Sequence, residues 1–158
     1  MSMATRATRA LDAAGVAYRL HPYDYEADVA AGKGLQAAAA LGIAPERVLK
    51  TLMAWVDARA VCAVIPSDRQ LQFKALAATC AGKAARMMEV AEAERRSGYK
   101  VGGVSPFGQQ RPLPVWFEQD ALSNGNVFIN AGQRGLLLEI DPADALRVLQ
   151  ASSAAISR

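Results

Sequence analysis

The first part of the chain alternates short helical and strand-like patterns of apolar residues. Residues 4–14 set Leu11 among alanines and arginines and stop at Gly15, which predicts a short helix with a glycine end. Residues 16–20 alternate as a strand does. The polar, acidic and glycine-bearing stretch 21–34 predicts a loop.

The next part carries the longest apolar runs. An alanine-rich helix is expected over residues 35–41, and Pro45 suits the first position of a further turn. Residues 48–56 and 60–65 are apolar segments separated by Asp57-Ala58-Arg59, a pattern typical of a buried hairpin or pair of strands.

Helices and a long glycine loop follow. Residues 71–81, with Phe73, Leu76 and Ala77 on one face, and residues 90–96 are expected to be helical. Residues 97–108 hold four glycines and one proline in twelve positions, which excludes a regular element. The remaining expected elements are strands at 114–118, 126–130 and 136–140 and a helix at 142–149 with Asp141 as its N-cap.

The order of these elements predicts the fold class. Strands and helices are interspersed without a strict βαβ repeat, so we expect an α/β (α+β) fold with a curved, mixed, largely antiparallel sheet flanked by helices. The chain has 158 residues, of which 52% are hydrophobic, and neither a repeat nor a linker interrupts it. We therefore expect one domain over residues 1–158.

Composition excludes several classes of protein. No apolar run is long enough for a membrane span and the N-terminus is no signal segment, so we expect a cytoplasmic protein with no membrane partner. Cys62 and Cys80 stand singly and are expected to be reduced thiols. The net charge of +3 slightly favours binding to polyanions. One cluster of basic residues either meets phosphates or forms a solvated surface: Arg86, Arg95, Arg96, Lys100 and Arg111.

The charged candidates for chemistry are few. His21 is the single histidine, so neither a metal site nor a histidine-rich centre is expected, and it is more simply explained as the end of a strand. Lys50 interrupts an apolar strand, where its ammonium group either reaches a cavity or snorkels to solvent. Thr51 should point to the opposite face, so a joint role with Lys50 would need a twist or bulge.

Two glycine loops are the other candidates. The segment 102–106, from Gly102 and Gly103 to Ser105 and Pro106, lets the backbone approach a ligand and turn N–H groups towards an ester oxyanion. The second loop, residues 130–135, places Arg134 where it could contact a phosphate or carboxylate. Each loop could equally be a simple connection between elements.

Three motifs together resemble one family. They are VLKTL at 48–52, SGYKVGGVSPFG at 97–108 and RGLLLEI at 134–140, and the chain resembles the YbaK/EbsC group, relatives of the editing domain of bacterial prolyl-tRNA synthetases. The resemblance implies a trans-acting deacylase that clears a wrong amino acid from tRNA, chiefly tRNA(Pro), without a cofactor. It also implies aminoacylated tRNA as a partner, with prolyl-tRNA synthetase as a further candidate.

The resemblance also implies roles for individual residues. Lys50 would hold the 3′-terminal adenosine or its phosphate. Backbone N–H groups near Gly102 and Gly103 would polarise the ester carbonyl, in a loop whose Ser105 and Pro106 help to position the ester. Four further residues are expected to bind the substrate: Tyr23, Thr51, Asn130 and Arg134.

In cysteine-clearing members of this group, the thiol of the substrate itself is the implied nucleophile. This chain departs from their pattern at Asn130 and Leu137, where those members carry Ser and Asp. Specificity for alanine, serine or threonine in place of cysteine is therefore one alternative. A second alternative is a module that binds tRNA or a synthetase without catalysing a reaction.

Overall fold

The computed structural model of the protein describes residues 3–26 and 32–158. Its helices are α1 (Arg6–Ala13), α2 (Lys33–Leu41), α3 (Phe73–Thr79), α4 (Val90–Ser97) and α5 (Pro142–Leu149), with short 3₁₀ turns η1 (Pro45–Arg47) and η2 (Gln119–Leu122). Its strands are β1 (Arg19–Pro22), β2 (Leu49–Val56), β3 (Arg59–Pro66), β4 (Ala85–Met87), β5 (Val115–Glu118), β6 (Val127–Gln133), β7 (Leu136–Ile140) and β8 (Ser152–Ala154).

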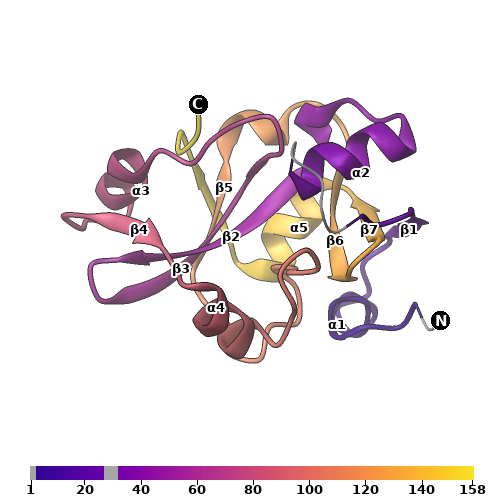
Figure 1. The fold of residues 1–158 in the computed structure, drawn as a ribbon, viewed down its shortest axis with the longest axis horizontal. Coiled ribbons are helices and arrows are strands. Elements are labelled where there is room, and N and C mark those ends of the chain that lie inside the picture. Colours follow the sequence, from indigo (N-terminus) through magenta and orange to yellow (C-terminus); the bar gives the residue numbers. More distant parts are fainter. Residues whose placement is uncertain (1–2, 27–31) are drawn as a thin grey trace.

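The strands form two sheets, arranged as Figure 1 shows. One is antiparallel with the order β1-β7-β6, and the other is mixed with the order β4-β2-β3-β5-β8. The pairs β3–β5 and β5–β8 are parallel and the other four are antiparallel. The mixed, largely antiparallel α/β arrangement predicted from the sequence is confirmed.

The join between the two sheets leaves one strand edge open. A parallel bridge between Val48 and Phe128 connects the start of β2 to β6. On the same edge of β2, pairing with β4 involves only Ala54, Trp55 and Val56. The stretch of β2 between these two attachments has no ladder partner on that edge within the described parts of the chain.

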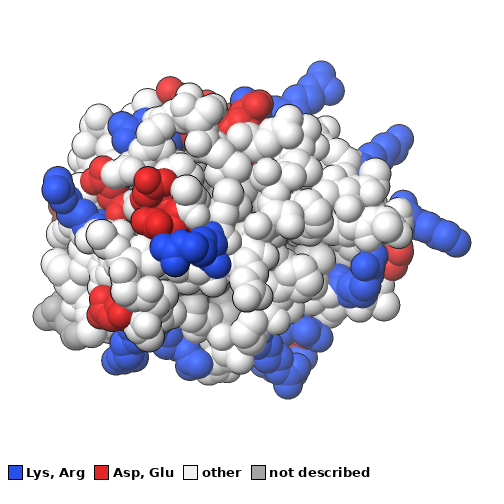
Figure 2. All heavy atoms as spheres, turned by 180° about the vertical axis from the view of Figure 1, so that it is seen from behind, with Lys and Arg blue, Asp and Glu red and all other residues white. Residues whose placement is uncertain are grey.

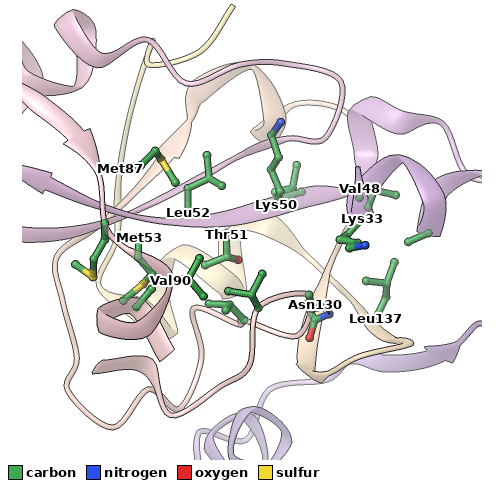
Figure 3. A pocket seen from close by; sticks show the side chains of 18 of the residues that line it. Lys33, Val48, Lys50, Thr51, Leu52, Met53, Met87, Val90, Asn130 and Leu137 are labelled. Carbon is green, nitrogen blue, oxygen red and sulfur yellow. Dashed lines mark hydrogen bonds between the residues drawn. The ribbon is translucent and has the colours of Figure 1, made fainter. Parts of the chain in front are cut away.

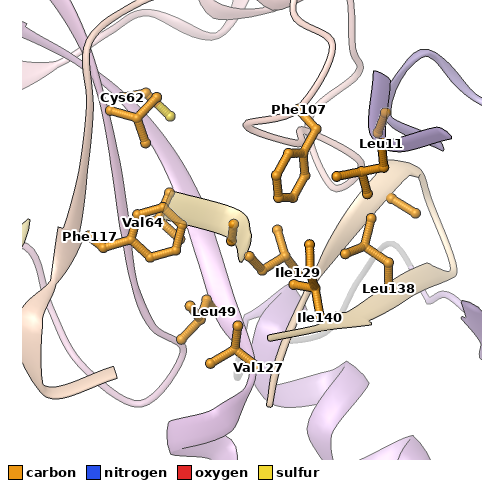
Figure 4. Packing of buried hydrophobic residues seen from close by; sticks show 14 of the residues in the cluster. Leu11, Leu49, Cys62, Val64, Phe107, Phe117, Val127, Ile129, Leu138 and Ile140 are labelled. Carbon is orange, nitrogen blue, oxygen red and sulfur yellow. The ribbon is translucent and has the colours of Figure 1, made fainter. Parts of the chain in front are cut away.

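The main core lies between the sheets. It joins Leu49 and Val64 of the larger sheet to Ile129 and Leu138 of the smaller one, with Phe107 from the glycine loop fully buried among them (Figure 4). Side chains of β2 alternate between this core and a second cluster on the α3 side of the larger sheet. Consecutive residues of β2 therefore face different surroundings.

Capping groups account for the ends of two helices. The Thr5 hydroxyl accepts from the Thr8 amide at 3.1 Å, and the Thr8 hydroxyl accepts from the Thr5 amide at 2.8 Å, which together form a capping box at α1. The Asp141 carboxylate accepts from the Ala143 amide at 2.9 Å at the start of α5, as the sequence predicted.

Several boundaries differ from the sequence prediction. The first strand begins at Arg19 and includes His21 and Pro22, which were expected in a loop, because it pairs with β7. Residues 27–31 of that predicted loop lie outside the described residues. Phe73, expected on the buried face of α3, is 38% exposed. Both β4 and β8 were missed, because three residues are too few to show an alternation.

The cysteines and the lengths of the helices bear on the chemistry and the surroundings of the chain. Cys62 and Cys80 are free thiols, the first buried and the second partly so. No helix in the described ranges is long and apolar enough to cross a membrane.

Candidate functional site

A cavity of about 340 Å³ lies along the open edge of β2 (Figure 3). Strand β2 provides one side, and α2, the start of α4, the glycine loop and the smaller sheet provide the others. Most of the lining is apolar, from residues such as Val48, Leu52, Met53, Met87, Val90 and Leu137. The cavity is therefore large enough for a small side chain of a ligand. Its apolar walls offer that side chain few hydrogen-bond partners.

Lys50 and Thr51 both line this cavity although they point to opposite faces of β2, as Figure 3 shows. The pairing of β2 with β3 runs without a register shift from Leu49 to Val56, so β2 has no bulge there. The two side chains meet the same cavity because it wraps around a free strand edge.

The ammonium group of Lys50 is partly desolvated. Burial lowers the pKa of Lys50, and the negative charge of Asp68 offsets part of this effect. No carboxylate of the described residues lies within ion-pair distance of this lysine. A half-buried cation without a close counter-ion is suited to bind an anionic or strongly polar group of a ligand.

Thr51 contributes polar groups from both its side chain and its backbone. Its hydroxyl oxygen is buried and has no hydrogen-bond partner within the described ranges. Because the Met53 carbonyl points to the β4 side, where it accepts from the Met88 amide at 3.0 Å, strand alternation points the N–H and C=O of Thr51 to that same open edge. The edge thus offers a donor and an acceptor to a ligand.

The glycine loop makes a tight turn at the cavity. The Gly103 amide donates to the Lys100 carbonyl at 2.8 Å, and Gly102 has a φ of +92°, a value that favours glycine. A Cβ atom at Gly102 would lie 2.5 Å from the Tyr25 hydroxyl oxygen. Gly102 lines the cavity, and its N–H has no acceptor among the residues described.

Residues 130–135, predicted as a loop, instead form the end of β6, which is irregular between Asn130 and Gln133, and a turn at 134–135. This segment, still called the second loop below, packs directly on the first. A Cβ atom at Gly103 would lie 2.9 Å from the Arg134 amide nitrogen and 3.0 Å from the Gln133 carbonyl carbon. Asn130 adds a side-chain link, since its Nδ2 donates to the Gly102 carbonyl at 3.1 Å. Its Oδ1 accepts from the amides of Gly132 at 2.7 Å and Gln133 at 3.1 Å. Asn130 therefore fixes both loops at once.

The structure brings five of the nine predicted site residues to the cavity: Tyr23, Lys50, Thr51, Gly102 and Asn130. Burial raises the pKa of Tyr23, whose amide donates to the Gly135 carbonyl at 2.9 Å. The roles of these residues stay predictions, while their convergence is a property of the fold.

The other four lie elsewhere. Ser105 and Pro106 are buried away from the cavity, and the Ser105 hydroxyl accepts from the Phe107 amide at 3.3 Å, so both residues anchor the loop. Gly103 is buried and its amide is already bonded within the turn, which leaves Gly102 alone with an unbonded N–H. Arg134 is exposed, and its Nε donates to the Val101 carbonyl at 2.9 Å.

Sequence reasoning singled out Leu137 but missed other residues that give the cavity its apolar walls. Met87 comes from the unpredicted strand β4, and Val90 is the first residue of α4. Tyr25 was also missed, although the cations of Lys33 and Arg134 lie over its ring, at 5.3 and 5.5 Å from its centroid. An aromatic residue two positions after Tyr23 was the only signal for it in the sequence.

His21 takes no part in the cavity. Its Nε2 lies 2.9 Å from Glu139 on the neighbouring strand, and its ring contacts the edge of Phe128. In the part of the chain that the structure describes, no three His, Cys, Asp or Glu side chains cluster in a way that could hold a metal ion.

Comparison with known families gives a match over most of the chain. The model of the aminoacyl-tRNA editing domain matches residues 31–148, which include the open edge of β2 and both glycine loops.

Similar proteins extend the match to nearly the whole chain. A protein of Enterococcus faecalis, EbsC, named as a candidate Cys-tRNA(Pro)/Cys-tRNA(Cys) deacylase, is 29% identical over 154 residues, or 97% of this chain and 93% of EbsC. Two crystal structures have the same fold. One, of a hypothetical protein, has a TM-score of 0.87 at 24% identity and covers 98% of this chain and 100% of its own. The other, of a candidate trans-editing enzyme for prolyl-tRNA synthetase, has a TM-score of 0.86 at 22% identity. The match covers 100% of this chain and 98% of that protein.

Proposed function

Because this chain belongs to the aminoacyl-tRNA editing domain family, we propose that it is a trans-acting aminoacyl-tRNA deacylase that clears cysteine from mischarged tRNA. Cys-tRNA(Pro) is the proposed main substrate and Cys-tRNA(Cys) a further one, as in the name of the relative EbsC. The observation that carries this proposal is the convergence of Lys50 and the unbonded Gly102 N–H on one apolar cavity.

The cavity suits the ester of an aminoacyl-tRNA. We propose that its apolar part accepts the side chain of the amino acid, and that the N–H of Gly102, a residue that lines the cavity, donates to the ester oxygen as negative charge develops there. The Lys50 side chain leaves β2 on the face opposite to that of Thr51, and its proposed role is to hold the terminal adenosine or its phosphate. The open edge at Thr51 offers main-chain groups to the α-amino group.

The described lining contains no cysteine, histidine, aspartate or glutamate. This supports the thiol of the substrate as the nucleophile. Its sulfur forms a bond to the ester carbonyl carbon, the bond from that carbon to the ribose oxygen breaks, and the thiol proton goes to the departing oxygen. Free tRNA leaves, and water then opens the cyclic thioester to give cysteine.

An alternative within the same enzyme class rests on Leu137. This leucine is buried in the cavity wall, where cysteine-clearing relatives carry a polar residue, and Asn130 uses most of its hydrogen bonds to hold the loops. Such a wall favours a small apolar side chain such as that of alanine over a hydroxyl-bearing one.

The modest net charge of +3 supports weak, salt-sensitive binding of tRNA. Figure 2 shows, on the face opposite to that of Figure 1, scattered Lys and Arg side chains with wide uncharged areas between them. We therefore expect the isolated protein to discriminate poorly among tRNAs, with prolyl-tRNA synthetase as the proposed source of selectivity for tRNA(Pro) in the cytoplasm.

The test is deacylation of Cys-tRNA(Pro), Ala-tRNA(Pro) and Ser-tRNA(Pro) by the wild type, Lys50→Ala and the surface control Lys74→Ala. Loss of cysteine that depends on Lys50 and not on Lys74 supports the proposal. Faster release of alanine selects the alternative. Binding of tRNA without turnover on all three substrates would overturn the enzymatic assignment and leave a binding module.

A further inference from the structure

The peptide groups around Gly102 are almost completely bonded. The carbonyl of Gly102 accepts from Asn130, and the N–H of the same peptide plane, that of Gly103, donates to Lys100. The carbonyl of the preceding plane, that of Val101, accepts from Arg134 Nε at 2.9 Å. Three of the four polar groups of the two planes are thus held, and the fourth is the Gly102 N–H.

Arg134 controls the direction of that remaining group. The Val101 carbonyl and the Gly102 N–H belong to one trans peptide plane, so they point in opposite directions. The exposed Arg134 side chain holds this carbonyl, so the N–H of the same plane points away from the guanidinium group, and Gly102 itself lines the cavity. Rotation of this plane would turn the donor away from a bound ester.

The guanidinium group is itself held in place. The Tyr25 ring lies 5.5 Å from it, and the backbone of Arg134 packs against Gly103. A planar group that is stacked on an aromatic ring and bonded through Nε has little freedom to follow a mobile phosphate.

We propose that Arg134 is a positioning residue for deacylation, which acts through the Val101–Gly102 peptide to aim the Gly102 N–H at the ester oxygen. The proposal rests on the proposed function, because it concerns the donor of that reaction. It replaces the expectation from the sequence that Arg134 contacts the phosphate or carboxylate of the substrate.

The variants Arg134→Lys and Arg134→Met separate the two roles. Lysine keeps the charge but places a carbon atom where Nε stands, so it loses the bond to the Val101 carbonyl. For a positioning role, both variants lower kcat for the preferred aminoacyl-tRNA by about tenfold to a hundredfold, and KM changes by less than about twofold. If Arg134 contacts a phosphate, Arg134→Lys retains kcat, Arg134→Met raises KM, and the proposal is wrong. Arg147→Lys on α5, where Arg147 pairs with Asp144, is the matched control.

A second measurement needs no substrate. In the wild type the Gly103 amide is protected from hydrogen exchange by its bond to Lys100. If Arg134 holds the turn, Arg134→Lys speeds exchange at Gly103 by about tenfold or more, while protection in β2 is unchanged. Unchanged exchange at Gly103 overturns the positioning role. Absence of deacylation by the wild type would instead refute the proposed function, and the exchange result would still decide whether Arg134 holds the turn.

Discussion

The side-chain amide of Asn130 donates to the carbonyl of Gly102 at 3.1 Å and so links two loops that are 28 residues apart in the sequence. The same side chain accepts from the amides of Gly132 and Gln133. One residue thereby fixes the conformation of both loops at the edge of the cavity.

Asn130→Asp is expected to keep the hydrogen bonds accepted from the amides of Gly132 and Gln133. It replaces the Nδ2 donor with a carboxylate oxygen that faces the Gly102 carbonyl. Repulsion between the two oxygens should turn the loop and lower kcat by about tenfold or more. Steady-state deacylation kinetics measure the effect, and Asn124→Asp, at an exposed asparagine, is the control. A kcat equal to that of the wild type would mean that the bond is incidental.

The lowered pKa of Lys50 predicts a pH dependence of ligand binding. Because burial disfavours its charged form, Lys50 loses its proton at a lower pH than an ordinary lysine, whose pKa is 10.5. Affinity for a non-hydrolysable amide-linked cysteinyl minihelix should fall by about tenfold as the pH rises through this lowered pKa. Lys50→Arg, which stays charged, should bind equally across the range, and Lys74→Arg should retain the alkaline decrease. A decrease that persists in Lys50→Arg would assign it to another group.

Glu118 is expected to stabilise the segment that follows β8 at the C-terminal end. Its side chain is 1% exposed, and Oε1 accepts from the Ile156 amide at 3.0 Å, the Ser157 amide at 2.9 Å and the Ser157 hydroxyl at 2.7 Å. Glu118→Gln, whose NH₂ group cannot replace both carboxylate oxygens, should lower the free energy of unfolding by about 1–3 kcal/mol in urea titrations. Glu46→Gln, at an exposed position in η1, should change it little.

The same carboxylate predicts sensitivity to acid. Burial alone would raise its pKa, but the hydrogen bonds from Ser157, Asp120 and Ile156 outweigh burial and lower the pKa below 4.5. A carboxyl group whose pKa is lowered in the folded state stabilises the protein at pH values above its pKa in the unfolded state. This stabilisation is lost as the pH falls through its pKa in the folded state. The free energy of unfolding of the wild type should therefore fall more steeply with decreasing pH below about pH 4.5. Glu118→Gln should remove part of this pH dependence.

Gly103→Ala should separate the two loops. The added methyl group would stand 2.9 Å from the Arg134 nitrogen, a backbone atom that cannot move alone, so we expect a loss of about 1–3 kcal/mol in stability and a reduced kcat. Gly125→Ala, where no atom lies within 4 Å but φ is +80°, should lose about 1 kcal/mol and keep its activity. Equal kcat for the two variants would contradict the close packing of the loops.

Sequence patterns predicted the longer elements and the glycine loop at 97–108 because these carry local signals. The prediction of a loop over 130–135 was wrong, because pairing with β7 extends β6 to Gln133. Residues 48–56 are apolar enough to specify a strand, and glycine density specifies an irregular loop at 97–108. The short strands β4 and β8 have no such signal, since they exist only through pairing with β2 and β5.

The direction of side chains within the loops could not be predicted. Ser105 and Gly102 are three positions apart in one motif, yet one is buried in the core and the other lines the cavity. The shared access of Lys50 and Thr51 was also hidden, because it depends on where β4 stops pairing with β2. Both facts are set by tertiary contacts between segments distant in the sequence.

The open edge of β2 has a consequence for how the family can diversify. The polar groups that Thr51 and Gly102 present to the cavity include main-chain atoms, and replacement of the apolar residues that line the cavity does not remove them. Changes at Val48, Met87 or Leu137 can therefore retune which amino acid fits while leaving the ester-facing donors untouched. Different atoms therefore determine which amino acid fits the cavity and which groups face the ester. Residues that set selectivity can change while the donors to the ester stay the same.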